Sequence, residues 1–77
     1  MKIKDIKELL KALGWTDLGE QKMSSMLSFT KDTYRLNIYT TTMAVTIQDS
    51  RTAWNRRTTR VFRDINSLKQ LENAARL

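Results

Sequence analysis

Apolar residues recur at steps of three and four along the first thirteen positions, with lysines and acids between them. This spacing is typical of an amphipathic helix and predicts a helix over residues 2–13. Gly14 follows directly and is expected to take the left-handed conformation that ends many helices, with Trp15 folding back onto Leu10. The apolar stripe consists of Ile3, Ile6, Leu9, Leu10 and Leu13.

The apolar spacing then changes to two, which is the pattern of half-buried β-strands. Strands are predicted over residues 23–30, 34–41 and 43–47, and the polar stretch 16–22 is predicted to be a connection. The threonine run at 40–42 lacks the Asn-Gly or Asp-Gly of a tight hairpin turn. A looser turn is therefore equally compatible with it.

A fourth strand is predicted over residues 58–65, where each side carries a large apolar group. The pattern therefore does not decide which side is buried. Ser67, followed three residues later by Gln70, fits a capping box at the start of a last helix. The apolar stripe of this helix consists of Leu68, Leu71, Ala74 and Ala75.

The predicted elements follow one another in the order α-β-β-β-β-α within a single domain, residues 1–77. Short connections between strands favour an antiparallel meander, whose apolar face needs a covering layer. The sequence therefore predicts an α+β fold. In this fold a four-stranded antiparallel sheet carries the N- and C-terminal helices on one face.

Composition restricts the chemistry that the chain can perform. With 40% hydrophobic and 29% charged residues, it is typical of a folded soluble domain. Cysteine and histidine are absent, which removes disulfides, thiolate nucleophiles, the common zinc sites and imidazole bases. No apolar run is long enough for a signal peptide or a membrane span. We expect a cytoplasmic, non-catalytic protein without cofactor, metal or membrane contact.

Positive charge is concentrated in residues 51–63, which hold five of the seven arginines, no acid, and +5 of the net charge of +6. Arginine makes planar, bidentate contacts with phosphate, and phosphate contacts dominate nucleic-acid affinity. We call residues 51–63 the arginine segment and predict that it binds RNA, DNA or a nucleoprotein complex. The predicted binding residues are Arg51, Trp54, Arg56, Arg57 and Arg60, with Lys4, Lys7, Lys11 and Tyr39 in a supporting role.

Strand alternation places Arg60 and Arg63 on opposite sides of the fourth predicted strand. Arg63 is therefore expected to form a structural ion pair, with Asp49 or Asp64 as its partner. A solvated basic face is the alternative explanation for the arginines. In that case Trp54 would be an anchor in the core.

Two other classes of function fit parts of the sequence. The same arginines could engage an acidic protein surface in an interaction module or a homodimeric adaptor, because complementary charge steers association. A metal-dependent nuclease would need a magnesium ion between Asp49 and Asp64, which flank the arginines without a spacing motif. We favour the binding module, since catalysis requires a positioned acid, base and stabiliser together.

The layout as a whole resembles small accessory proteins encoded by phages and mobile elements, anti-CRISPR inhibitors among them. The resemblance lies in the N-terminal helix MKIKDIKELLKALGW, the following strands and the final helix SLKQLENAARL. It implies a compact inhibitor that blocks a host defence complex by binding to it. Many such inhibitors are acidic mimics of DNA, whereas this chain is strongly basic. A basic version would instead seek RNA, DNA or an acidic protein groove.

Overall fold

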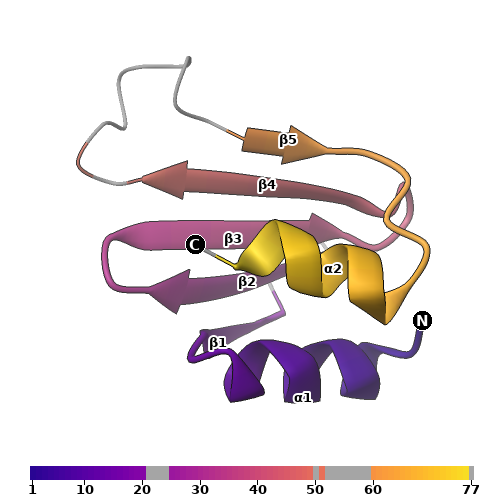
Figure 1. The fold of residues 1–77 in the computed structure, drawn as a ribbon, viewed down its shortest axis with the longest axis horizontal. Coiled ribbons are helices and arrows are strands. Elements are labelled where there is room, and N and C mark those ends of the chain that lie inside the picture. Colours follow the sequence, from indigo (N-terminus) through magenta and orange to yellow (C-terminus); the bar gives the residue numbers. More distant parts are fainter. Residues whose placement is uncertain (21–24, 50, 52–59, 77) are drawn as a thin grey trace.

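The computed structural model describes residues 1–20, 25–49, 51 and 60–76. Its strands form one antiparallel sheet in the order β1-β2-β3-β4-β5, with a helix at each end of the chain (Figure 1). The α+β class and the antiparallel meander are therefore confirmed. The elements are α1 (Ile3–Ala12), β1 (Thr16–Glu20), β2 (Met26–Lys31), β3 (Tyr34–Tyr39), β4 (Ala44–Asp49), β5 (Arg60–Phe62) and α2 (Leu68–Ala75).

The sheet has five strands, so the predicted count of four is wrong. The additional strand is β1, in the stretch that the polar sequence predicted to be a connection. Aspartate and glycine are depleted in strands, and both occur in β1. The strand forms nevertheless because its backbone pairs with β2, placing Thr16 opposite Thr30 and Asp17 opposite Phe29. A bulge follows Asp17, and Gly19 takes a positive φ of 82° there.

β2, β3 and β5 occupy the predicted regions with shorter bounds, whereas β4 begins one residue later and ends two residues later than the predicted 43–47. β2 begins at Met26, while residues 23 and 24 of the predicted strand lie outside the described part of the chain. β5 covers only Arg60–Phe62 of the predicted stretch 58–65. Residues 58 and 59 are not described, and the extended backbone ends where Asp64 takes a φ of 57°.

The end of α1 is a Schellman motif centred on Gly14. The amide of Trp15 donates to the Leu10 carbonyl oxygen at 2.9 Å, and the amide of Gly14 donates to the Lys11 carbonyl oxygen at 3.0 Å. The Lys31 ammonium donates to the Leu13 carbonyl oxygen at 2.7 Å, so the β2–β3 turn also caps this helix. The predicted left-handed cap is confirmed, and it turns the chain directly into β1.

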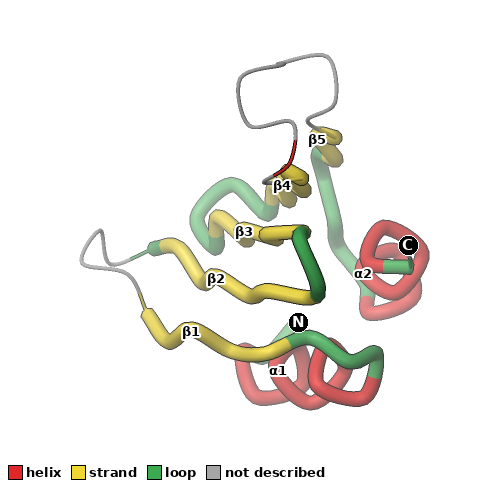
Figure 2. The backbone as a smooth tube through the Cα atoms, turned by 90° about the vertical axis from the view of Figure 1, so that its left-hand side faces the viewer, coloured by secondary structure: helices red, strands yellow, loops and turns green. Residues whose placement is uncertain are grey.

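Both helices pack against one face of the sheet, as Figure 2 shows. Ile6 and Leu10 of α1 and Leu71 and Ala75 of α2 join a single core cluster with alternate strand residues. The Trp15 indole NH donates to the Ala75 carbonyl oxygen at 3.3 Å, which connects the end of α1 to α2. The strand members of the cluster are Leu27, Phe29, Leu36, Ile38, Val45 and Ile47.

Neither α1 nor α2 lies on the other face of the sheet. Directly opposed residues of antiparallel strands share a face, so the strand register identifies its members. We call this surface the open face. The residues that the register places on it are Thr16 of β1, Met26, Ser28 and Thr30 of β2, Arg35, Asn37 and Tyr39 of β3, Ala44, Thr46 and Gln48 of β4, and Val61 of β5.

A capping box begins α2. The capping box at Ser67 and Gln70 is confirmed, with the Gln70 amide donating to the serine hydroxyl at 3.2 Å. Within the described residues, neither helix has the length and apolar character needed to cross a membrane.

Gly14→Ala is expected to destabilise the fold by about 1–2 kcal/mol, the cost of a left-handed conformation for an L-residue. Gly14 has a φ of 93°, and an added Cβ would lie 3.3 Å from Lys31 Cε. Gly19→Ala is the control, because it shares the positive φ but meets no atom within 4 Å. Urea denaturation of both variants checks this. Both variants carry the cost of a positive φ, so the excess loss in Gly14→Ala comes from the close contact with Lys31, and an equal or smaller loss for Gly14→Ala would contradict that contact.

Candidate nucleic-acid interface

The β4–β5 hairpin places Arg51 and Arg60 of the arginine segment at the same end of the sheet. Arg51 comes two residues after the end of β4, and Arg60 begins β5 opposite Ile47 (Figure 1). Both side chains are exposed. The structure thus brings together these two of the predicted binding residues. Trp54, Arg56 and Arg57 lie outside the described residues.

Arg51 is held by Asp49. Its guanidinium Nη2 lies 2.8 Å from Asp49 Oδ2 and its Nε lies 3.2 Å from both carboxylate oxygens, while its backbone amide donates to Oδ1 at 3.0 Å. The Asp49 side chain is 13% exposed and that of Arg51 is 66% exposed. The carboxylate therefore fixes the direction in which this arginine leaves the sheet, and it also competes with any phosphate for the same guanidinium.

This pairing lowers the pKa of the Asp49 carboxyl well below its usual value. The main causes are the hydrogen bonds from the Arg51 side chain and backbone, with a smaller one from the Thr33 hydroxyl. Partial burial acts in the opposite direction. Reciprocally, the hydrogen bond to Asp49 raises the pKa of Arg51. Both groups are charged at neutral pH.

The β4–β5 register confirms that Arg60 and Val61 point to opposite sides. Arg60 faces the helix side, with Phe62 opposite Val45, and Phe62 packs against the core. The undecided side of this strand is thereby settled. Arg63 follows the strand and is exposed, at the end of β4 opposite to Asp49.

The predicted partners of Arg63 do not pair with it in the part of the chain described here. The salt bridges among described residues assign Asp49 to Arg51, and none of them involves Arg63. For Asp49 the physical reason is distance along the hairpin. Arg63 lies near the first residue of β4 and Asp49 is its last residue, five positions further on, which is about 16 Å at the rise of a strand.

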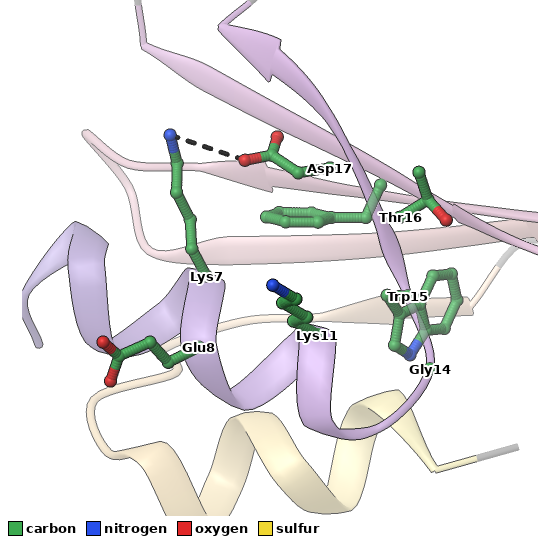
Figure 3. A pocket seen from close by; sticks show the side chains of 8 residues that line it. Lys7, Glu8, Lys11, Gly14, Trp15, Thr16 and Asp17 are labelled. Atoms are coloured by element: carbon green, nitrogen blue, oxygen red, sulfur yellow. Dashed lines mark ion pairs between the residues drawn. The ribbon is translucent and has the colours of Figure 1, made fainter.

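The lysines of α1 lie at the other edge of the sheet. Lys7 and Lys11 line an open hollow of about 570 Å³ beside β1, together with Trp15 and Phe29 (Figure 3). Lys7 Nζ lies 3.5 Å from Asp17 Oδ2, so its charge is partly compensated. Since β1 and β5 are opposite edges of the sheet, the structure does not join these lysines to Arg51 and Arg60. The remaining predicted lysine, Lys4, is exposed on α1.

The open face contains a polar network that sequence reasoning did not identify. The Ser28 hydroxyl, fully buried, donates to Asn37 Oδ1 at 2.7 Å. Arg35 lies over this pair, with Nε 3.4 Å from Asn37 Oδ1 and Nη2 3.4 Å from Ser28 Oγ. Tyr39, four residues along the same strand face, is 38% exposed. The period-two alternation of β3 could have placed Arg35 beside Tyr39, but only the register brings in Ser28.

Acidic side chains avoid this surface. The open face contains Arg35 and no Asp or Glu, among the strand residues whose side chains the structure describes. The strand acids Asp17 and Asp49 stand opposite Phe29 and Tyr34, both of which belong to the helix side. The acids of the sheet therefore point away from the open face.

The two acids that a metal-dependent nuclease would need are not brought together. Asp49 ends β4, whereas Asp64 follows β5 at the opposite end of the hairpin. One ion cannot be bound by both at oxygen-ligand distances of about 2.0–2.6 Å. No group of three or more potential metal ligands occurs within the described ranges.

Known proteins supply no template for this chain. Comparison found no matching family model, no similar curated protein and no similar solved structure. The residues and geometry above are therefore the basis for a functional proposal.

Asp49→Asn is expected to lower stability at neutral pH, because it removes a carboxylate whose pKa is depressed in the folded state. Such a group stabilises the fold fully above its unfolded pKa, about 3.9. The contribution is lost as the pH falls through the lower folded pKa. The difference in urea midpoint between wild type and Asp49→Asn should therefore be constant above about pH 5 and shrink below about pH 4.

Arg51→Gln provides the matched test of the same pair. A double-mutant cycle with Asp49→Asn should show a coupling at pH 7 that decreases at pH 3. A cycle with no coupling at pH 7 would contradict the ion pair as a stabilising contact in solution.

Proposed function

We propose that this protein is a non-catalytic module that binds nucleic acid through its arginine segment. The observation that supports this most is the β4–β5 hairpin, which holds exposed Arg51 and Arg60 at one end of the sheet. The chain between them contains Arg56 and Arg57 and no acid. Three arginines thus belong to a single connection between neighbouring strands, and a fourth, Arg60, begins the strand that follows.

Charge distribution favours this surface over the rest of the molecule. The lysines of α1 alternate with Asp5 and Glu8, and Lys7 is paired with Asp17. Glu72 of α2 is paired with both Lys69 and Arg76. In the arginine segment, by contrast, the compensating acid within the described residues is Asp49, which pairs with Arg51. Uncompensated arginine is what neutralises backbone phosphate.

An acidic protein surface is the other partner that these arginines would fit, and the binding experiments below separate the two. The role of an inhibitor of a host defence complex, which the resemblance to phage accessory proteins implies, stays a hypothesis. It would give the bound nucleic acid a context but does not alter the residues of the proposal.

Binding should show the salt dependence of phosphate contacts. If Arg51, Arg56, Arg57 and Arg60 each neutralise one phosphate, log affinity should fall with log salt at a slope of about −3.6 on duplex DNA or −2.8 on a single strand. Replacing both Arg56 and Arg57 with alanine should reduce that slope by about 1.8 or 1.4 respectively. Fluorescence anisotropy with labelled oligonucleotides at several salt concentrations measures it.

The matched control replaces Lys2 and Lys69 with alanine. Both side chains are exposed, one before α1 and one on α2, so the change in net charge is the same but the surface differs. The control should retain the wild-type slope. Absence of affinity for any oligonucleotide at low salt would contradict the proposal. Recovery of one stoichiometric protein from nuclease-treated lysate would then favour an acidic protein partner.

Asp49→Asn is expected to strengthen nucleic-acid binding, although it weakens the fold. The carboxylate occupies the Nε and Nη2 edge of Arg51 and adds a negative charge beside the arginines. Its removal should raise affinity by several-fold at low salt, with a smaller effect at high salt because of screening. The anisotropy titration is made at neutral pH on protein shown to be folded. Weaker binding would instead show that Asp49 positions Arg51 for its partner.

A further inference from the structure

The open face extends the proposed site across the sheet. We propose that the bound nucleic acid is single-stranded and lies across this face, with a base stacked on Tyr39 and the backbone near Arg35. This inference rests on the proposed function and names the form of nucleic acid and the surface that receives it. RNA and single-stranded DNA share this chemistry.

The face is exposed where a partner would contact it. Two of the large apolar side chains that are exposed in the described residues lie on it: Tyr39 at 38% and Val61 at 53%. They come from β3 in the middle of the sheet and β5 at its edge. Both helices lie on the other side (Figure 2). Neither helix therefore covers this platform.

The middle strand carries the groups that a single strand requires. β3 is the third of the five strands in the sheet. Its residues Arg35, Asn37 and Tyr39 alternate onto the open face. The first and last of these are four residues apart, about 13 Å along the strand. Base stacking on an aromatic ring tolerates any base, and an arginine close to it can bind phosphate. The amide of Asn37 lies between the two.

Arg35 is positioned before any ligand arrives. The contacts of its guanidinium to Ser28 Oγ and Asn37 Oδ1 are long, at 3.4 Å each, while the Ser28 to Asn37 hydrogen bond beneath is short, at 2.7 Å. The network therefore orients the guanidinium along the face without pairing its charge with an acid. Orientation in advance reduces the entropy lost on binding.

The same surface continues towards the arginine segment. Val61 stands opposite Thr46, and Thr46 stands opposite Asn37, so one cross-strand row leads from the middle strand to β5. Arg60 and Arg51 lie at that edge, but Arg60 faces the helix side and Arg51 pairs with Asp49, which points to the same side. A nucleic-acid strand on the open face would therefore pass over the β5 edge to reach them. Because Asp17 and Asp49 point to the helix side, a polyanion crossing the open face meets no described strand acid. Charge complementarity thus favours a polynucleotide on this face.

A duplex fits the face less well than a single strand. Five strands at about 4.8 Å spacing make a platform about 19 Å wide, which exceeds the roughly 12 Å width of the major groove. The bases of a duplex are also stacked on one another, so none is free to stack on Tyr39. Single strands expose the faces of their bases, and sequence-tolerant proteins use sheets with aromatic residues to bind them.

Two pairs of variants test the platform by anisotropy, using a labelled twelve-nucleotide RNA, the single-stranded DNA of the same sequence and its duplex. Tyr39→Ala should weaken single-strand binding by roughly tenfold to a hundredfold, whereas Tyr39→Phe should retain it. Val61→Glu should weaken it as well, by placing an acid on the open face. Leu68→Glu is its control, since this side chain is similarly exposed at 37% but lies on α2. Circular dichroism confirms that each variant is folded.

The outcomes separate this inference from the proposed function. The inference is supported if wild type binds RNA or single-stranded DNA more tightly than the duplex, and if this binding is lost in Tyr39→Ala and Val61→Glu but kept in Tyr39→Phe and Leu68→Glu. If Tyr39→Ala and Val61→Glu bind normally while loss of Arg56 and Arg57 abolishes binding, the platform is wrong and the proposed function stands. If wild type binds no oligonucleotide, both fail. A wild-type dimer that Val61→Glu converts to a monomer in light scattering would also overturn it, because a second copy would then cover the face.

Discussion

Two short helices can cover one face of this sheet and leave the other in contact with solvent. α1 and α2 have ten and eight residues, which correspond to lengths of about 15 and 12 Å. Their apolar residues meet those strand positions that alternate towards them. Period-two alternation then determines the chemistry of both surfaces. Every strand residue adjacent to a core residue belongs to the open face, so the same pattern that builds the core also selects what a partner would meet.

The contacts around Trp15 fix the helical layer on that face. The left-handed turn at Gly14 directs the chain from α1 into β1, and the buried indole donates to the end of α2. Lys31 closes the same corner from the β2–β3 turn. The two helices, the edge strand β1 and the β2–β3 turn are thus connected around Gly14 and Trp15. The two layers are held together there, far along the sheet from the β5 edge and its arginines.

Much of this fold could be predicted from the sequence, because both helices and the strands β2, β3 and β4 bury regular apolar stripes. β1 could not, since Asp17 and Gly19 give no apolar alternation and the strand depends on pairing with β2. The predicted ion pair of Arg63 failed for a related reason. The β4–β5 register directs Arg63 to the opposite end of β4 from Asp49, and Asp49 pairs instead with Arg51, two residues further along the chain. Arg35 was also missed, because charge counting favours runs and this arginine stands alone until the sheet places it beside Ser28 and Tyr39.

The central claim is that nucleic acid contacts both the arginine segment and the open face. Amide chemical shifts of ¹⁵N-labelled protein titrated with a short single strand test it most directly. The account predicts shifts in the arginine segment and at Arg35, Tyr39 and Val61, with α1 and α2 little affected. Shifts confined to the helices, or to the hollow beside Lys7 and Lys11, would contradict it.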